Sequence, residues 1–258
     1  MNISITADKL LSKLFGEAKN INEKMKIDLN ISFKKYLQKS YDKYSQIRTI
    51  IYKPEPRYLY DFFECNFLKH NNSEINACDV NNLLDISNFL VVEGTGGIGK
   101  STMMKHLFLD EISKSDLIPI FIELKDINIQ KSTFFDFIYS TINILGINFE
   151  EEYFKYALEN GCFLLLFDGY DEVTSERSSI LINDIRDFCD RYPKNYYIVS
   201  SRPNNISSCL DRFSLLEMVP LSKEQAVNLI KKIDYDLTCK TNFIEQLRSN
   251  LYEKNQSF

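Results

Sequence analysis

The sequence predicts an α/β fold in which a mainly parallel sheet lies between two layers of helices. Continuous apolar runs, typical of strands buried on both faces, alternate along the chain with segments that carry one apolar helical face. In addition, half of the eight glycines fall between residues 94 and 99, directly between one such strand and one such helix. Strands that alternate with helices are joined by crossovers, which produce a parallel sheet in three layers.

The first strand of this core is expected at residues 88–93, which contain the apolar run Phe-Leu-Val-Val. The helix that follows the glycines carries Met103, Leu107 and Phe108 on one face. Further strands and helices follow in alternation. The strands are expected at residues 117–124, 164–167, 196–201 and 213–218, and the helices at 132–145, with Ser132 as N-cap, and 175–190.

The glycine-rich segment matches the phosphate-binding loop pattern G-x-x-x-x-G-K-[ST]. Glycine lets such a loop curl until successive backbone N–H groups point at phosphate oxygens. Lys100 would bring its charge to the β- and γ-phosphates, and Ser101 would offer a hydroxyl to Mg²⁺. A chance match in a flexible loop is the alternative, but the strand before the run and the helix after it favour nucleotide binding. The predicted nucleotide contacts are Gly94, Thr95, Gly96, Gly97, Ile98, Gly99, Lys100, Ser101 and Thr102.

Three carboxylates follow the strand at residues 164–167. Ligands of open α/β sheets bind outside the carboxyl ends of the strands, so these acids are expected beside the phosphate loop. Asp168 is predicted to hold Mg²⁺ together with Ser101, and Asp171 or Glu172 to orient and polarise the attacking water. An ordinary polar strand end is the alternative, and the nearby phosphate loop argues against it.

The strand at residues 196–201 ends in the sequence Ser-Ser-Arg-Pro. An arginine at this edge of a phosphate-binding sheet can reach the γ-phosphate through charge-assisted hydrogen bonds. Arg202 is therefore predicted to report whether the γ-phosphate is present. Taken alone, the same sequence is more typical of a surface turn.

The phosphate loop, the run Leu-Leu-Leu-Phe-Asp-Gly-Tyr-Asp-Glu and the Ser-Ser-Arg-Pro sequence together resemble the NACHT family of signal-transduction NTPases, over roughly residues 88–220. The resemblance implies a three-layer P-loop NTPase core, and analogy with related NTPases implies the strand order 5-1-4-3-2. It also implies binding and slow hydrolysis of ATP, sometimes GTP, with Mg²⁺. A closed ADP state would convert to an oligomeric ATP state in innate, antiphage defence. The catalytic roles carried over fall on Asp171, Glu172 and Arg202.

Composition is that of an ordinary globular protein. Apolar residues make up 44% of the 258 residues, and the net charge is −5. The longest apolar run, residues 162–167, is far shorter than a membrane span, and no signal peptide is visible. The six cysteines form no C-x-x-C pair, so they are expected to be reduced core thiols of a cytoplasmic protein. His106 is expected to pack rather than to bind metal.

A helical N-terminal region is expected at residues 1–69, followed by a connector at 70–87. Residues 1–50 carry ten Lys and Arg against five Asp and Glu, a charge of +5. We interpret them as a helical subdomain with solvated lysines; an adaptor or nucleic-acid-contacting arm is the alternative, and nucleic acid is not expected as a partner. Residues 57–63 include four aromatic side chains, which are expected to pack, or else to line a nucleotide base. Two apolar stripes are expected in this region, one formed by Leu10, Leu11, Leu14 and Phe15, and one by Phe33, Leu37, Tyr41 and Tyr44.

The C-terminal residues 221–258 are expected to begin a helical lid subdomain. Ser222 and Gln225 form a capping box that opens a helix through Ile233, and a second helix is expected at 243–251. Because similar proteins continue further, we expect a truncated switch that retains nucleotide weakly and self-associates or joins a partner polypeptide. Two other functions stay open at this point: a nucleotide-binding scaffold that does not hydrolyse, and, with less support, a P-loop metabolic kinase.

Overall fold

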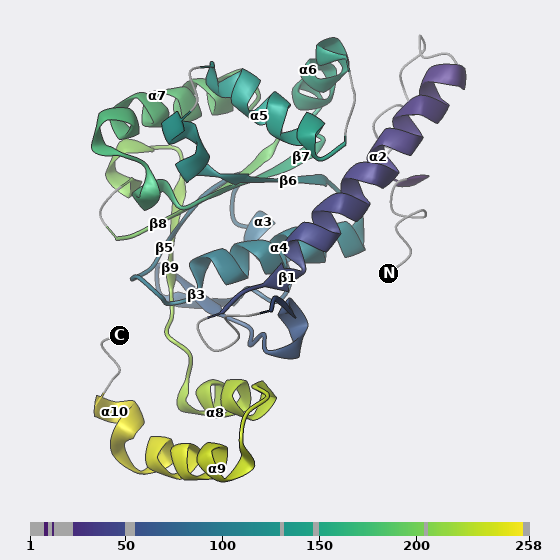
Figure 1. Cartoon of the computed structure of the whole chain (residues 1–258). Helices are drawn as coiled ribbons and strands as arrows, with labels where there is room; N and C mark the ends of the chain where they lie inside the picture. Colours follow the sequence, from purple (N-terminus) through teal and green to yellow (C-terminus); the bar gives the residue numbers. More distant parts are fainter. Residues whose placement is uncertain are drawn as a thin grey trace.

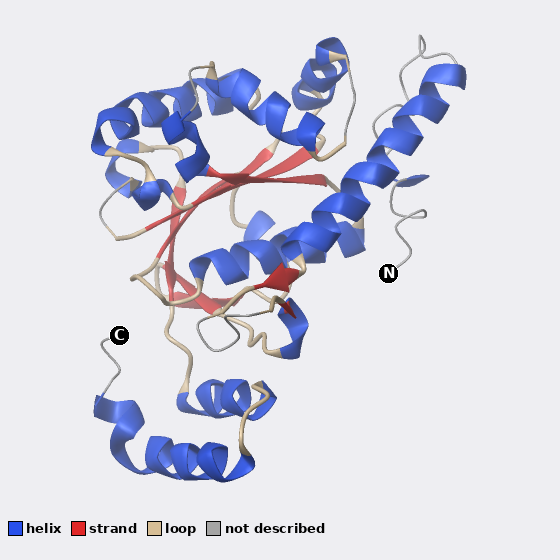
Figure 2. Ribbon diagram, in the orientation of Figure 1, coloured by secondary structure: helices blue, strands red, loops and turns tan. Residues whose placement is uncertain are grey.

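The computed structural model describes residues 8–9, 12, 23–49, 55–129, 132–146, 150–203 and 206–254. Within them, seven strands form the main sheet, and helices cover both of its faces (Figures 1 and 2). The strands are β1 (Gln46–Ile47), β2 (Arg57–Tyr58), β3 (Phe67–His70), β4 (Ser73–Asn76), β5 (Phe89–Glu93), β6 (Ile118–Glu123), β7 (Phe163–Asp168), β8 (Tyr196–Ser201) and β9 (Ser214–Met218). The helices are α2 (Glu23–Tyr44), α3 (Asn81–Leu84), α4 (Lys100–Lys114), α5 (Phe134–Ile144), α6 (Glu151–Glu159), α7 (Ser175–Arg191), α8 (Lys223–Lys232), α9 (Leu237–Gln246) and α10 (Tyr252–Lys254).

The parallel part of the sheet has the strand order β9-β5-β8-β7-β6. Numbered from β5 onward, this is the predicted order 5-1-4-3-2, which is therefore confirmed. Every residue of β5 and β7 is buried, as expected for strands covered on both faces. The carboxyl ends of these strands lie at one edge, where the glycine-rich loop and the acids emerge.

A hairpin formed by β3 and β4 extends the sheet beyond β9. β3 pairs antiparallel with both β4 and β9, and Leu68 lies opposite Met218. The sequence prediction for this stretch was the end of a helical region and then a connector. These strands are short and β4 is largely exposed, so neither has the apolar run that identifies the core strands. The hairpin turn includes Asn71 at φ 54°, a backbone conformation that asparagine adopts more readily than most residues.

Helices α5 and α7 cover one face of the sheet, and α4 covers the other (Figure 1). On the first face Phe134 packs against Phe167 and Phe188, with ring centroids 5.5 and 5.7 Å apart. Thr133, rather than the predicted Ser132, caps α5, because its hydroxyl oxygen accepts the Asp136 N–H at 3.2 Å. Aromatic side chains from strands and helices thus meet within a core that is otherwise largely aliphatic.

Helix α2 crosses α4 and reaches the edge strand β6. Tyr36 donates a hydrogen bond to the Pro119 carbonyl at 2.6 Å, and Tyr44 donates to the Phe121 carbonyl at 3.4 Å. These hydroxyls occupy carbonyls on the open side of β6, which protects that edge from pairing with another chain. The predicted stripe on this helix is confirmed, since Phe33, Leu37 and Tyr44 are buried and Tyr41 packs beside the core. The other predicted stripe, Leu10, Leu11, Leu14 and Phe15, lies outside the described residues.

Helices α8, α9 and α10 form a group below the sheet, joined to β9 by a short segment (Figure 1). The predicted capping box is present: Ser222 accepts the Gln225 N–H at 3.2 Å, and Gln225 accepts the Ser222 N–H at 2.8 Å. The next helix begins earlier than predicted, at Leu237, because the Asp236 carboxylate caps it through the Cys239 N–H. Across the described residues, no helix has both the length and the apolar character needed to cross a bilayer.

The prediction of six reduced core thiols is wrong. Cys65 and Cys78 are joined in a disulfide, with Cα atoms 5.5 Å apart. Two of the remaining cysteines, Cys209 and Cys239, are exposed, whereas Cys189 is buried. Pairing between β3 and β4 brings the two ends of the hairpin together, and the sequence contained no signal for that pairing.

Candidate functional site

The glycine-rich loop connects β5 to α4 at the carboxyl edge of the sheet. Gly97 and Gly99 have φ of 80° and 105°, in the left-handed region that glycine adopts without steric cost. At position 94 glycine is needed for lack of space, because a Cβ there would lie 2.9 Å from the Ile98 side chain and 3.0 Å from that of Met218. The loop is therefore shaped by glycine at positions where side chains would strain it or would not fit.

Lys100 is the first residue of α4 and folds back over the loop. Its Nζ donates to the Gly94 carbonyl at 2.6 Å and to the Thr95 carbonyl at 3.1 Å. Burial lowers the pKa of Lys100, and the neighbouring Asp171 carboxylate opposes that shift. The ammonium group is thus held by neutral oxygens that an anionic ligand can replace.

Asp168 lies at the carboxyl end of β7 and is buried. Ser200, on the neighbouring strand β8, donates to its Oδ1 at 2.5 Å and accepts the Gly169 N–H at 2.8 Å. Burial raises the pKa of Asp168, while hydrogen bonds from Ser200 and Ser101 act in the opposite direction. The Ser101 hydroxyl and the Asp168 carboxylate are therefore neighbours, and two oxygen donors of this kind fit Mg²⁺.

Arg202 and Asp171 form an ion pair across the site. Arg202 Nε lies 2.8 Å from Asp171 Oδ2, and the arginine side chain is 62% exposed against 9% for the aspartate. The guanidinium also lies beside the loop, 3.7 Å from the position that a Cβ on Gly96 would take. The predicted sensor arginine is thus placed between one of the predicted catalytic acids and the phosphate loop.

Glu172 follows in the 3-10 helix η3 (Tyr170–Glu172), which begins after Gly169 at φ 78°. The Glu172 carboxyl packs beside Gly169, while its backbone is fixed by Asn128, from the 3-10 helix η2 (Leu124–Ile129). Asn128 Nδ2 donates to the Glu172 carbonyl at 3.2 Å, and its Oδ1 accepts the Thr174 N–H at 3.0 Å. Sequence reasoning missed Asn128, which belongs to no motif.

These groups surround one cavity of about 590 Å³. The structure brings six of the nine predicted loop residues together with Asp171, Glu172 and Arg202, whereas Gly94, Thr95 and Ile98 are not part of the lining. Asp168 lies behind this lining, next to Ser101 and Ser200. The lining residues are Arg48, Thr49, Gly96, Gly97, Gly99, Lys100, Ser101, Thr102, Gly169, Asp171, Glu172, Ser200 and Arg202.

Arg48 and Thr49 were not predicted as site residues. They follow β1, which pairs with β2, and this pairing brings the N-terminal region to the rim of the cavity. The excess of basic residues in the first fifty was the available signal, but it did not single out Arg48. The residues described at 57–63 are not part of this lining. Instead, the Phe63 ring stacks on the ring of His106 with centroids 4.4 Å apart.

His106 packs within α4, as expected. A carbonyl can only accept, so Nε2 carries the proton that it donates to the Cys78 carbonyl at 3.1 Å, and Nδ1 accepts from the Tyr60 hydroxyl at 3.1 Å. Burial lowers the pKa of His106, which favours the neutral ring. The side chain is occupied on both nitrogens by protein groups.

Comparison with known proteins identifies the family. The model of the NACHT domain matches residues 88–235, which is more than half of the chain. Among curated proteins, none matches the chain at a significant level.

The solved structures that match the chain include three at 14–17% identity. A structure described as a DNA replication initiation factor is 17% identical with a TM-score of 0.42, and covers 66% of this chain and 54% of its own. Cdc6p from Pyrobaculum aerophilum is 14% identical with a TM-score of 0.38, and the match covers 55% of this chain and 42% of Cdc6p. AMPPCP-bound DnaA from Aquifex aeolicus is 15% identical with a TM-score of 0.41, and the match covers 69% of this chain and 61% of DnaA. The chain spans about half of the length of these proteins.

Proposed function

Because the chain belongs to the NACHT domain family, we propose that it is a switch that binds Mg²⁺ with ATP or GTP and hydrolyses the nucleotide slowly. One observation carries the proposal: a single cavity is lined by the phosphate loop, by Asp171 and Glu172, and by Arg202. Its volume of about 590 Å³ lies within the range of about 300–1,000 Å³ usual for small-molecule sites.

The phosphates are assigned to the loop and to the amino end of α4. Backbone N–H groups of the loop and the positive end of the helix dipole attract anions there. In this binding mode Lys100 leaves the Gly94 and Thr95 carbonyls for the β- and γ-phosphates. Ser101 and Asp168 would hold Mg²⁺, which supplies positive charge to the phosphate oxygens. Arg48 and Thr49 lie on the remaining wall and are assigned to the base or sugar.

The two acids receive different roles in the proposal. Asp171 is engaged by Arg202, so it is the poorer candidate for the group that orients water. Glu172 is exposed in the cavity wall and has its backbone fixed by Asn128, so we assign water activation to Glu172. Arg202 leaves Asp171 when a γ-phosphate offers it a second anionic partner.

The output of the switch is a further part of the proposal. Family membership supports a cytoplasmic signalling role in antiphage defence, with the triphosphate state driving self-association or assembly with a partner polypeptide. A second candidate is a scaffold that binds nucleotide without hydrolysing it. The Arg202–Asp171 ion pair favours this candidate, since it occupies one of the two acids near the loop.

Replacement of Glu172 with glutamine separates the two candidates. The variant keeps the shape of the side chain and removes the carboxylate, so hydrolysis should fall by about 10²–10⁴-fold while nucleotide affinity is retained. Phosphate release under single-turnover conditions measures the rate of hydrolysis, and calorimetry measures the nucleotide affinity. Glu176→Gln, an exposed residue on α7, is the matched control. Wild-type protein that binds nucleotide without releasing phosphate would instead support the scaffold.

A further inference from the structure

The disulfide between Cys65 and Cys78 closes the base of the β3–β4 hairpin. Cys65 lies just before β3 and Cys78 just after β4, with a sequence separation of 13. Cys78 is exposed and Cys65 is half-buried, so small molecules in solvent can reach the bond from the Cys78 side. The bond therefore joins two segments whose other contacts lead to different parts of the molecule.

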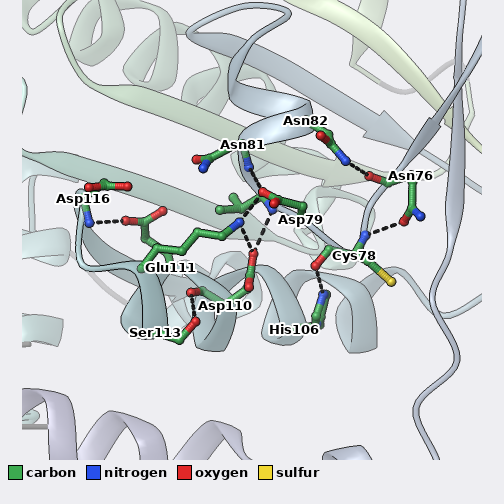
Figure 3. Close-up of polar contacts among 12 residues, drawn as sticks. Asn76, Cys78, Asp79, Asn81, Asn82, His106, Asp110, Glu111, Ser113 and Asp116 are labelled. Atoms are coloured by element: carbon green, nitrogen blue, oxygen red, sulfur yellow. Dashed lines mark hydrogen bonds and ion pairs between the residues drawn. The ribbon is translucent and has the colours of Figure 1, made fainter. Parts of the chain in front are cut away.

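The segment at Cys78 is attached to α4, the helix that follows the phosphate loop (Figure 3). The Cys78 carbonyl accepts from His106, and the Val80 N–H donates to Asp110 Oδ2 at 2.8 Å. Lys114, at the end of the same helix, bridges Asp79 and Asp110. Three consecutive residues, 78–80, are thus bonded to successive turns of α4.

The segment at Cys65 is attached to α8. The Cys65 carbonyl accepts from Gln225 Nε2 at 2.6 Å, and Gln225 also completes the capping box of that helix. At the other end of α8, Lys232 Nζ donates to the Phe63 carbonyl at 2.6 Å and lies 2.7 Å from Glu64 Oε1. Residues 63–65 are therefore the surface on which both ends of α8 rest.

We propose that Cys65 and Cys78 form a reversible redox site, and that their oxidation couples the C-terminal helices to the phosphate-loop helix. The oxidised state ties the surface under α8 covalently to the segment bonded to α4. In the reduced state the two segments are held by strand pairing and by the hydrogen bond from Ala77 N–H to the Asn66 carbonyl, at 3.0 Å. The co-reactants are small thiols and disulfides of the glutathione class.

The reaction is thiol–disulfide exchange. The thiolate of a small thiol attacks Sγ of Cys78, and the sulfur of Cys65 leaves as a thiolate that takes a proton from solvent. A second small thiol then releases Cys78 and forms the small-molecule disulfide. Two electrons pass from two small thiols to the protein, and the reverse sequence restores the bond.

Reduction is expected to loosen the hairpin and the base of α8. A cross-link lowers the entropy of opened states, so its removal makes local opening more frequent. Amide hydrogen exchange in β3, β4 and α8 should quicken by about tenfold in the reduced protein. Strand β7, which lies in the interior of the sheet, is the internal reference and should not change.

The test uses the full chain in buffers of reduced and of oxidised glutathione, followed by alkylation under denaturing conditions and mass spectrometry, so that buried thiols such as Cys189 also react. Oxidised protein is expected to alkylate at four cysteines and reduced protein at six, and the peptide pair that changes should contain Cys65 and Cys78. Cys78→Ser should remove the exchange difference, whereas the double variant Cys209→Ser, Cys239→Ser, which lacks both exposed free thiols, should preserve it.

Six alkylated cysteines in both buffers would overturn the redox site, as would protection of any other cysteine pair. These readouts need no variant, so they remain decisive if a serine substitution prevents folding. Unchanged exchange in α8 despite reversible oxidation would overturn the coupling. Nucleotide turnover is not measured, so the result does not depend on the proposed function.

Discussion

Replacement of Asn128 with alanine should slow hydrolysis while nucleotide affinity is kept. Asn128 makes two hydrogen bonds, to the Glu172 carbonyl at 3.2 Å and from the Thr174 N–H at 3.0 Å, which fix the backbone on both sides of Val173. Each such bond contributes about 0.5–1.5 kcal/mol net, so the pair contributes about 1–3 kcal/mol. If the substitution removes this stabilisation from the transition state but not from the bound ground state, the rate of hydrolysis falls by about 5- to 150-fold.

The assay is single-turnover phosphate release, with the dissociation constant measured separately by calorimetry. Asn128 does not line the cavity, so affinity should be unchanged. Asn160→Ala is the matched control, because Asn160 also donates to a backbone carbonyl, that of Tyr156 at 2.8 Å, but caps the remote helix α6. Equal turnover in Asn128→Ala and wild type would show that Glu172 does not depend on this contact.

Two further predictions concern buried and paired acids. Burial raises the pKa of Glu111 to about 7. A carboxyl whose pKa is higher in the folded state adds stability below its unfolded pKa of about 4.3, and this contribution is lost as pH rises through 7. Between pH 4 and 8, wild type should therefore lose about 3 kcal/mol more unfolding free energy than Glu111→Gln in urea titrations, and parallel curves would refute this. Asp171→Asn releases Arg202, so affinity for ATPγS relative to ADP should rise by up to about fivefold in calorimetry, and an unchanged ratio would count against the sensor assignment.

The parallel core could be predicted from sequence because its strands are short, continuous apolar runs. β5 and β7 are buried along their whole length, and that environment selects the residues seen in the sequence. The strand order was available only from the family resemblance, since alternation alone does not specify it. The phosphate loop was recognisable because Gly97 and Gly99 adopt backbone conformations that other residues resist.

The parts that the sequence did not reveal depend on contacts between distant residues. Arg48 reaches the cavity only because β1 pairs with β2. Ser200 acts through a hydrogen bond to Asp168, and Asn128 acts through hydrogen bonds to backbone groups. Contacts of this kind do not require a fixed spacing between residues in the sequence. Cys65 meets Cys78 through a hairpin whose outer strand is largely exposed, so its sequence lacks the apolar run of a core strand.

Titration of the purified chain with Mg²⁺-ATP and Mg²⁺-GTP by calorimetry tests the central claim most directly. Lys100→Ala removes the charge assigned to the β- and γ-phosphates, and Lys155→Ala, on the distant helix α6, is the matched control. Wild type and Lys155→Ala should bind nucleotide saturably, and binding should be lost or strongly weakened in folded Lys100→Ala. Equal affinity in all three proteins, or no binding by wild type, would contradict the claim.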